Sequence, residues 1–242
     1  MTPKTYARGM TPSGTAVTLR GWTAHDLDAF RGWLRPEHEW HRWDGPYYPV
    51  PTAGQADALV AALARSSGLD RAAGGEPPSD TPPDGEDPAD GEDPPDGEDP
   101  PDGEDPPAAG DLLPPGRLVV DVGGVLVGTV AWYWESRETE WARMGVTVYD
   151  PAVRGRGIGR TALALWTSLL FESTPWVRLD FATWSGNDAM LGVGKALGFT
   201  EEARFRQARM VDGVRYDSVV MGVLRDEWRD PARRQPFRGS LS

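Results

Sequence analysis

The feature that most constrains this chain is a turn rich in glycine and arginine, which lies between a predicted strand, 141–149, and a predicted helix, 159–171. Glycines at the start of a helix leave backbone N–H groups accessible, and the helix dipole adds partial positive charge there. Arginine side chains add full positive charge. The turn contains Arg154, Gly155, Arg156, Gly157, Ile158, Gly159 and Arg160. This combination predicts a binding site for a pyrophosphate group.

Two common phosphate-binding motifs do not fit this turn. A Walker A loop requires Gly-Lys-Ser or Gly-Lys-Thr, and neither follows the glycines. A dinucleotide-binding turn has the spacing G-x-G-x-x-G and an acidic residue about 20 positions later at a strand end. Here the spacing is G-x-G-x-G, and Asp180 lies inside the predicted strand 177–184. The turn therefore favours a different pyrophosphate ligand.

Patterns of apolar residues predict an α/β domain around the turn. A chain of 242 residues is long enough for one domain or two small ones. Gly123-Gly124 and Asp212-Gly213 are typical of turns between paired strands. The predicted strands are 15–22, 117–122, 125–135, 141–149, 177–184, 203–211 and 214–224, and the predicted helices are 24–34, 55–65, 159–171 and 187–197. A strand–helix–strand order in the middle of the chain predicts a parallel crossover.

An acidic repeat interrupts this pattern. Hexapeptides such as PPDGED recur in a stretch that holds 15 acidic residues and no Lys or Arg. Without that stretch, 22 acidic residues face 25 basic ones, and the net charge changes from −12 to +3. A segment with so few apolar side chains cannot offset the entropy cost of becoming ordered. The predicted organisation is a single domain over 15–228, a disordered insert over 68–115 and flexible ends at 1–14 and 229–242.

Several motifs resemble one known family. The R-x-x-G-x-G sequence over 154–159 is similar to the acyl-CoA pyrophosphate motif [QR]-x-x-G-x-[GA] of the GNAT N-acetyltransferases. Two downstream segments, 183–187 and 195–199, resemble the RimJ/RimL-like branch of that family, as does an aromatic loop, 39–48. The resemblance implies an α/β (α+β) GNAT fold, in which a mixed central sheet is splayed around a strand–helix–strand acyl-CoA site.

The resemblance also implies acetyl-CoA as the co-substrate. In such proteins the pantetheine arm pairs with the backbone of the strand before the turn, and an Asn after the next strand contacts it. Asn187 occupies that position, and it could equally cap the following helix. The residues implied to bind acetyl-CoA are Val146, Thr147, Val148, Tyr149, Arg154, Gly155, Arg156, Gly157, Ile158, Gly159, Arg160 and Asn187.

The acid–base chemistry stays open. The positions at which family members carry a Tyr acid, a Ser acid or a Glu base are Gly194, Met190 and Arg143 here. Two other carboxylates are candidates. Glu140 is either a base acting through water or an exposed turn residue, and Asp217 either binds the amine or contacts neighbouring backbone. Positioning of the reactants alone supplies much of the rate of such a reaction.

An aromatic loop between the first two predicted helices is the candidate acceptor side. Its aromatic residues either form an acceptor pocket or serve packing. They are Trp40, Trp43, Tyr47 and Tyr48. The expected function is transfer of an acetyl group from acetyl-CoA to an amine, a small molecule or a peptide N-terminus, by direct attack in a ternary complex. The alternative is a non-catalytic CoA-binding or interaction module.

Composition disfavours other classes of function. The chain has no Cys and only three His, so we predict no metal site. No apolar run is long enough for a membrane span, and we expect a cytoplasmic protein with no membrane partner. A net charge of −12 disfavours nucleic acid as a partner. A homodimer is a further expectation.

Overall fold

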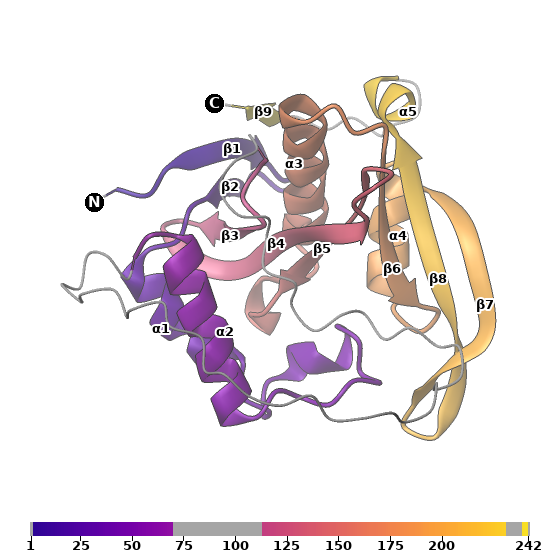
Figure 1. The fold of residues 1–242 in the computed structure, drawn as a ribbon, viewed down its shortest axis with the longest axis horizontal. Helices are drawn as coiled ribbons and strands as arrows, with labels where there is room; N and C mark the ends of the chain where they lie inside the picture. The colour runs from indigo at the N-terminus through magenta and orange to yellow at the C-terminus, as the bar shows by residue number, and fades with distance from the viewer. Residues whose placement is uncertain (1, 70–112, 231–238, 242) are drawn as a thin grey trace, which may run out of the picture.

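The computed structural model describes residues 2–69, 113–230 and 239–241. Within them, nine strands form one mixed sheet in the order β7-β8-β6-β5-β4-β3-β2-β1-β9 (Figure 1). The strands are β1 (Thr5–Met10), β2 (Ala16–Arg20), β3 (Arg117–Val122), β4 (Val125–Ser136), β5 (Trp141–Val148), β6 (Arg178–Trp184), β7 (Thr200–Val211), β8 (Val214–Leu224) and β9 (Gly239–Leu241). The helices are α1 (Ala24–Trp33), α2 (Ala53–Ser66), α3 (Ile158–Ser173), α4 (Asp188–Ala196) and α5 (Arg225–Arg229), with short 3₁₀ helices η1 (Glu39–Arg42) and η3 (Pro151–Val153). Most of the predicted acidic insert lies outside the described residues.

Helices cover both faces of the sheet. Because side chains alternate along a strand, β3 contributes Leu118 and Val120 to one core and Val119 to another. The larger core lies between the sheet and helices α3 and α4, and the smaller core lies under α1 and α2. This arrangement confirms the predicted α/β class, since a sheet with two apolar faces requires helices on each.

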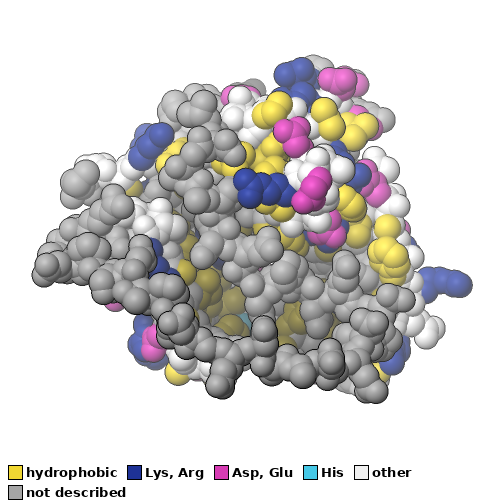
Figure 2. Space-filling model, in the orientation of Figure 1, with side chains coloured by type: hydrophobic (Ala, Val, Ile, Leu, Met, Phe, Trp, Pro, Cys, Tyr) yellow, Lys and Arg dark blue, Asp and Glu magenta, His cyan; other side chains and the backbone are white. Residues whose placement is uncertain are grey.

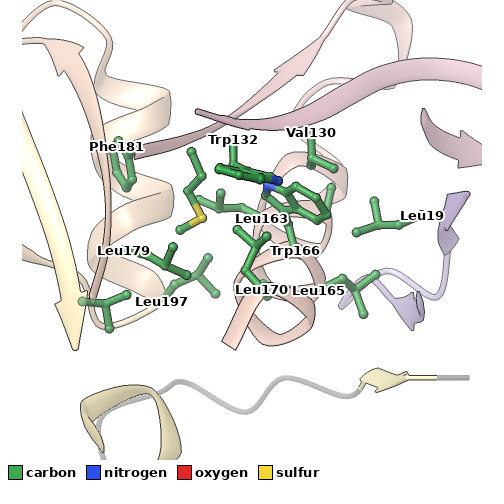
Figure 3. Close-up of a cluster of buried hydrophobic side chains, with 14 of the residues drawn as sticks. Leu19, Val130, Trp132, Leu163, Leu165, Trp166, Leu170, Leu179, Phe181 and Leu197 are labelled. Atoms are coloured by element: carbon green, nitrogen blue, oxygen red, sulfur yellow. The ribbon is translucent and has the colours of Figure 1, made fainter. Parts of the chain in front are cut away.

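Helix α3 is fixed against the sheet by large buried side chains. Leu163, Trp166 and Leu170 are fully buried, and Figure 3 shows them beneath Val130 and Trp132 of β4. The Trp166 Nε1–H donates to the Ala131 carbonyl oxygen at 3.0 Å, so the indole N–H is satisfied inside the core. This packing sets the position of the first turn of α3 relative to the neighbouring strands.

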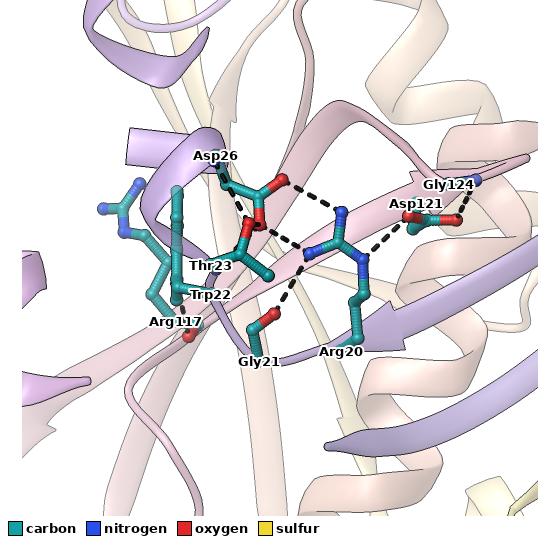
Figure 4. Close-up of polar contacts among 8 residues, drawn as sticks. All are labelled: Arg20, Gly21, Trp22, Thr23, Asp26, Arg117, Asp121 and Gly124. Carbon is teal, nitrogen blue, oxygen red and sulfur yellow. Dashed lines mark hydrogen bonds and ion pairs between the residues drawn. The ribbon is translucent and has the colours of Figure 1, made fainter. Parts of the chain in front are cut away.

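A buried ion network joins β2, the start of α1 and β3 (Figure 4). The Arg20 guanidinium donates to both Asp26 oxygens at 2.6 and 2.9 Å and to Asp121 Oδ2 at 2.7 Å. Thr23 donates to Asp26 through its backbone N–H and its hydroxyl. Burial alone would raise the pKa of Asp26, but the hydrogen bonds from Arg20 and Thr23 outweigh it and hold that pKa below its ordinary value. The network fixes the smaller core to the sheet.

The crossover predicted in the middle of the chain is present as β5–α3–β6. The two strands are parallel, but they pair only at Ala142 with Leu179 and at Arg143 with Asp180. Beyond these pairs the strands separate, while β6 pairs with β8 along its whole length. The predicted splay of the sheet at this point is therefore confirmed, and it opens a gap along the second half of β5.

The segments predicted to be flexible ends contain strands. Residues 5–10 form β1, which pairs with β2 and buries Ala7, and β9 pairs with β1 at the edge of the sheet. The predictions of flexibility over 1–14 and 229–242 are wrong for these strands. Neither segment has the alternating apolar pattern of a strand, and pairing with a neighbour provides the hydrogen bonds instead.

The surface that Figure 2 shows carries charges of both signs. Over the described residues of that face, Lys and Arg side chains lie among Asp and Glu side chains.

Candidate active site

A cleft of about 1530 Å³ opens where β5 and β6 separate. The second half of β5 forms one wall, and the end of β6 with the start of α4 forms the opposite wall. The glycine- and arginine-rich turn closes one end. Residues Trp43 to Tyr48 of the aromatic loop cover one side. The structure thus brings the predicted pyrophosphate turn and the predicted acceptor loop to a single cavity.

The backbone of the turn needs glycine at two positions. Gly155 has a φ of 72° and Gly157 a φ of 80°, both in the left-handed region that other residues avoid. Gly157 is the N-cap of α3, and a Cβ there would lie 3.1 Å from Pro12 Cδ in the β1–β2 turn. The first N–H groups of a helix have no partners within it. The Gly157–Arg160 stretch of this start lines the cleft.

The N-terminal hairpin supports the turn from outside. Ser13 Oγ donates to the carbonyl oxygen of Arg156 at 3.3 Å. Arg156 is exposed and is not among the residues that line the cleft. Its side chain therefore lies outside the predicted pyrophosphate site.

Arg154 connects the turn to the end of β5. Its guanidinium donates to the Val148 carbonyl oxygen at 3.2 and 3.3 Å and to that of Tyr149 at 3.4 Å. Arg154 also lines the cleft. In this structure the side chain therefore orders the turn, and its charge stays beside the predicted pyrophosphate position.

Only alternate residues of β5 offer backbone groups to the gap. The Tyr149 N–H donates to the Val127 carbonyl oxygen of β4 at 2.9 Å. Because the backbone groups of successive residues point to opposite sides of a strand, those of Thr147 also point toward β4. Val146 and Val148 then face the gap. The Tyr149 ring is buried beside Trp40, and burial raises its pKa to about 12. Thr147 nevertheless lines the cleft, whereas Tyr149 does not.

Asn187 performs two tasks at the other wall. Its Oδ1 accepts a hydrogen bond from the Met190 N–H at 3.1 Å and so caps α4, which is one of its two predicted roles. Its Nδ2 donates to the Trp43 carbonyl oxygen at 2.9 Å, which ties the aromatic loop to this wall. Asn187 also lines the cleft.

Comparison with known proteins identifies this arrangement. Residues 115–200 match the model of a family described as acetyltransferase (GNAT) domain. This stretch of the chain is thus similar to a GNAT acetyltransferase domain. The match contains both strands of the splayed pair and the turn between them, whereas the aromatic loop that covers one side of the cleft lies outside it.

Solved structures share the fold over most of the chain. Mycobacterium smegmatis RimJ in complex with CoA-disulfide is 17% identical, with 96% of this chain and 94% of that chain covered and a TM-score of 0.59. Salmonella typhimurium YncA with its cofactor acetyl-CoA is 18% identical, covering 86% and 93%, with a TM-score of 0.53. Vibrio cholerae spermidine N-acetyltransferase in complex with CoA and spermine is 14% identical, covering 88% and 98%, with a TM-score of 0.58.

Packing explains why this chain lacks the Tyr acid that other family members carry. Gly194, at the position where other members carry a Tyr, lies on α4 against β6 and β8. A Cβ on Gly194 would lie 2.7 Å from the Phe181 ring and 2.9 Å from the Met221 sulfur. Tyr cannot fit there without moving α4, because cores tolerate little added volume.

The two carboxylates predicted to be catalytic do not line the cleft. Glu140 lies on the exposed turn before β5, with a φ of 53°. Asp217 accepts hydrogen bonds from the Gln207 N–H and from Arg204, which hold its pKa below its ordinary value. A low pKa makes a poor base at neutral pH. The positions of both residues therefore argue against the predicted roles.

The aromatic loop divides into a packed part and an open part. Trp40 is 8% exposed, and its Nε1–H donates to the Trp33 carbonyl oxygen. Trp43 and Tyr48 are 40% and 37% exposed and line the cleft, as does Tyr47, whose ring lies 4.5 Å from the Arg209 guanidinium. The contacts of Trp40 correspond to the packing alternative, whereas the other three residues have the accessibility that an acceptor site requires.

Sequence reasoning gave no site role to several charged residues of the cleft. Asp44, Glu135 and Arg143 all line it. Arg143 is paired with Glu135 and Asp180 at 2.7 Å each, so it cannot act as the base that the family carries at this position. Asp44 belongs to the aromatic loop. A carboxylate among aromatic residues was the sequence feature that could have indicated its place in the cleft.

We expect Trp43→Ala to reduce amine-dependent turnover about 10-fold, since a cation over an indole ring contributes up to about 2 kcal/mol. The affinity for acetyl-CoA and the melting temperature should change little, because Trp43 is 40% exposed. Initial rates, calorimetry and thermal unfolding measure the three quantities. Trp40→Ala is the contrasting variant, and it should lower the melting temperature. If Trp43→Ala lowers the melting temperature as much, Trp43 serves packing.

Metal binding and membrane insertion each require a particular arrangement of residues. Among the described residues, no three His, Asp or Glu side chains gather as metal ligands would. None of the helices in the described part of the chain has the length and apolar character needed to cross a membrane.

Proposed function

We propose that the protein is an acyl-CoA-dependent N-acetyltransferase of the RimJ/RimL-like branch, with acetyl-CoA as donor and an amine as acceptor. The observation that carries the proposal is the cleft, in which the glycine turn and the backbone of Val146 and Val148 that faces the gap share one wall. Three structural relatives hold CoA, a CoA-disulfide or acetyl-CoA, and one of them also holds spermine.

The cleft residues suit the parts of acetyl-CoA. The N–H groups at the start of α3 and the Arg154 charge match a pyrophosphate, as helix N-termini commonly do. The pantetheine arm contains amides, which can pair with strand backbone at Val146 and Val148 as an added peptide would. The thioester then lies toward the point where β5 and β6 first pair. Direct attack of an amine there needs no covalent enzyme intermediate.

Turnover separates this proposal from a non-catalytic CoA-binding module. We would incubate the full chain with acetyl-CoA and with spermine, phenethylamine or a short peptide that has a free N-terminal Ser, and measure release of the CoA thiol. The proposal expects release that depends on one of these amines. Tight binding of acetyl-CoA without amine-dependent release would support the binding module instead.

A further inference from the structure

The face of β5 that carries Thr147 contains an open position between two carboxylates. Side chains two residues apart point to the same face of a strand, about 7 Å apart, so Arg143, Gly145 and Thr147 form one row. A Cβ added to Gly145 would meet no atom within 4 Å, and Gly145 lines the cleft. Arg143 holds Glu135 on one side of this opening. Thr147 holds Asp44 on the other side.

The two carboxylates differ in their partners. Glu135 Oε2 lies 2.7 Å from the Arg143 guanidinium, which stabilises its charge. The partner of Asp44 is instead a neutral group, because its Oδ2 accepts a hydrogen bond from Thr147 Oγ1 at 3.1 Å. Of the two, Asp44 is therefore the one that can receive a proton or pair with a cation.

Several titratable groups surround Asp44. His41 belongs to η1 and Arg117 to β3, and Tyr149 directly follows β5. Tyr47 stands in the same loop as Asp44, and the Arg209 guanidinium lies over its ring. Asp44 is exposed to the open cleft. The protein atoms around it still displace part of its water and raise its pKa, although the Thr147 hydrogen bond and the charges of Arg117 and His41 act against that rise. A carboxylate with a raised pKa is a better base near neutral pH.

We propose that Asp44 binds the ammonium group of a cationic amine acceptor in the space beside Gly145 and accepts its proton. The exposed rings of Trp43 and Tyr48 line the same cleft, and aromatic faces attract such a cation. This inference rests on the proposed function, and it names a protonated primary amine as the acceptor class.

The proposed transfer removes two protons from the ammonium nitrogen. One ammonium proton passes to an Asp44 carboxylate oxygen and leaves a nitrogen lone pair. That pair forms the C–N bond at the thioester carbonyl carbon, and the C–S bond then breaks with its electrons on sulfur. The nitrogen loses a second proton, which neutralises the CoA thiolate, and the Asp44 proton goes to water.

The test compares the wild type with Asp44→Asn, which keeps an oxygen for Thr147. With the amine of the panel above that the wild type acetylates fastest, kcat/KM at pH 7 should fall at least about 100-fold, as the loss of general-base catalysis predicts. In the variant, the fall of kcat/KM at acidic pH (the acidic limb of the pH profile) should disappear. Acetyl-CoA affinity should stay within twofold. The melting temperature should not fall, because a carboxylate with a raised pKa destabilises the folded state at pH 7. Asp57→Asn, an exposed residue of α2 outside the cleft, is the charge-matched control.

Thr147→Val provides a second, independent readout. The Thr147 hydroxyl lowers the pKa of Asp44, so its removal should move the acidic limb of kcat/KM to higher pH. If Asp44→Asn keeps kcat/KM within threefold with an intact acidic limb, the proposal fails while amine turnover by the wild type still supports the proposed function. If Asp44→Asn loses acetyl-CoA affinity in parallel, Asp44 is structural and the proposal also fails. No turnover by the wild type with any amine of the panel would reject the proposed function itself.

Discussion

Gly157→Val should weaken acetyl-CoA binding by about 10- to 100-fold. The φ of 80° at this position is strained for a β-branched residue, and its side chain would also meet Pro12 and Thr11 of the β1–β2 turn. The first N–H groups of α3 would then move away from the phosphates. One hydrogen bond to a charged group contributes about 1.5–3 kcal/mol, which corresponds to that range of affinity. Titration calorimetry with acetyl-CoA measures the change directly.

Gly14→Val is the matched control for this prediction. Gly14 has a φ of 85°, so the substitution introduces the same kind of backbone strain, but its Cβ would meet no atom within 4 Å and the residue does not line the cleft. It should therefore lower stability without changing acetyl-CoA affinity. Equal losses of affinity in the two variants would mean that general destabilisation, and not the turn, explains the effect.

Arg20→Met should give the largest loss of stability. It would leave Asp26 and Asp121 buried without their cation, and breaking a buried ion pair costs about 3–5 kcal/mol. For a domain of this size that corresponds to a fall in melting temperature of about 10 °C. Arg31→Met is the control, because the Arg31–Asp57 pair is exposed and its loss should change stability little. Similar melting temperatures for the two variants would contradict the role given to Arg20.

The loss caused by Arg20→Met should depend on pH in a defined direction. The pKa of Asp26 is below its ordinary value in the folded wild type, so its contribution is present above the unfolded pKa and is lost as the pH falls through the folded pKa. Without Arg20, burial raises the pKa of Asp26 instead, and protonation relieves the unpaired charge. The stability difference between the two proteins should therefore be smaller at pH 4 than at pH 7.

The local parts of the site could be predicted from the sequence. The turn is encoded within a few residues, since Gly155 and Gly157 both occupy the left-handed region and α3 begins directly after them. The strand–helix–strand order likewise predicted the parallel pair, and the resemblance to the GNAT family implied its splay. Such features depend on neighbouring residues, and short-range patterns carry them.

The parts that depend on strand register could not be predicted. Whether Val146 or Thr147 faces the gap is decided by the pairing of β5 with β4, and the burial of Trp40 by its packing on Tyr149. Asp44 and Thr147 are 103 positions apart in the chain and meet only in the folded domain. The approach of Pro12 to Gly157 also depends on tertiary structure, which is why the sequence alone predicted a flexible segment over 1–14.

A crystal structure of the full chain with acetyl-CoA tests the central claim most directly. We expect pyrophosphate oxygens within hydrogen-bond distance of the backbone N–H groups from Gly157 to Arg160. The pantetheine arm should lie along Val146 and Val148, and the acetyl group beside Gly145 in reach of Asp44. Acetyl-CoA bound outside the gap between β5 and β6, or bound there with its pyrophosphate away from the glycine turn, would contradict the central claim.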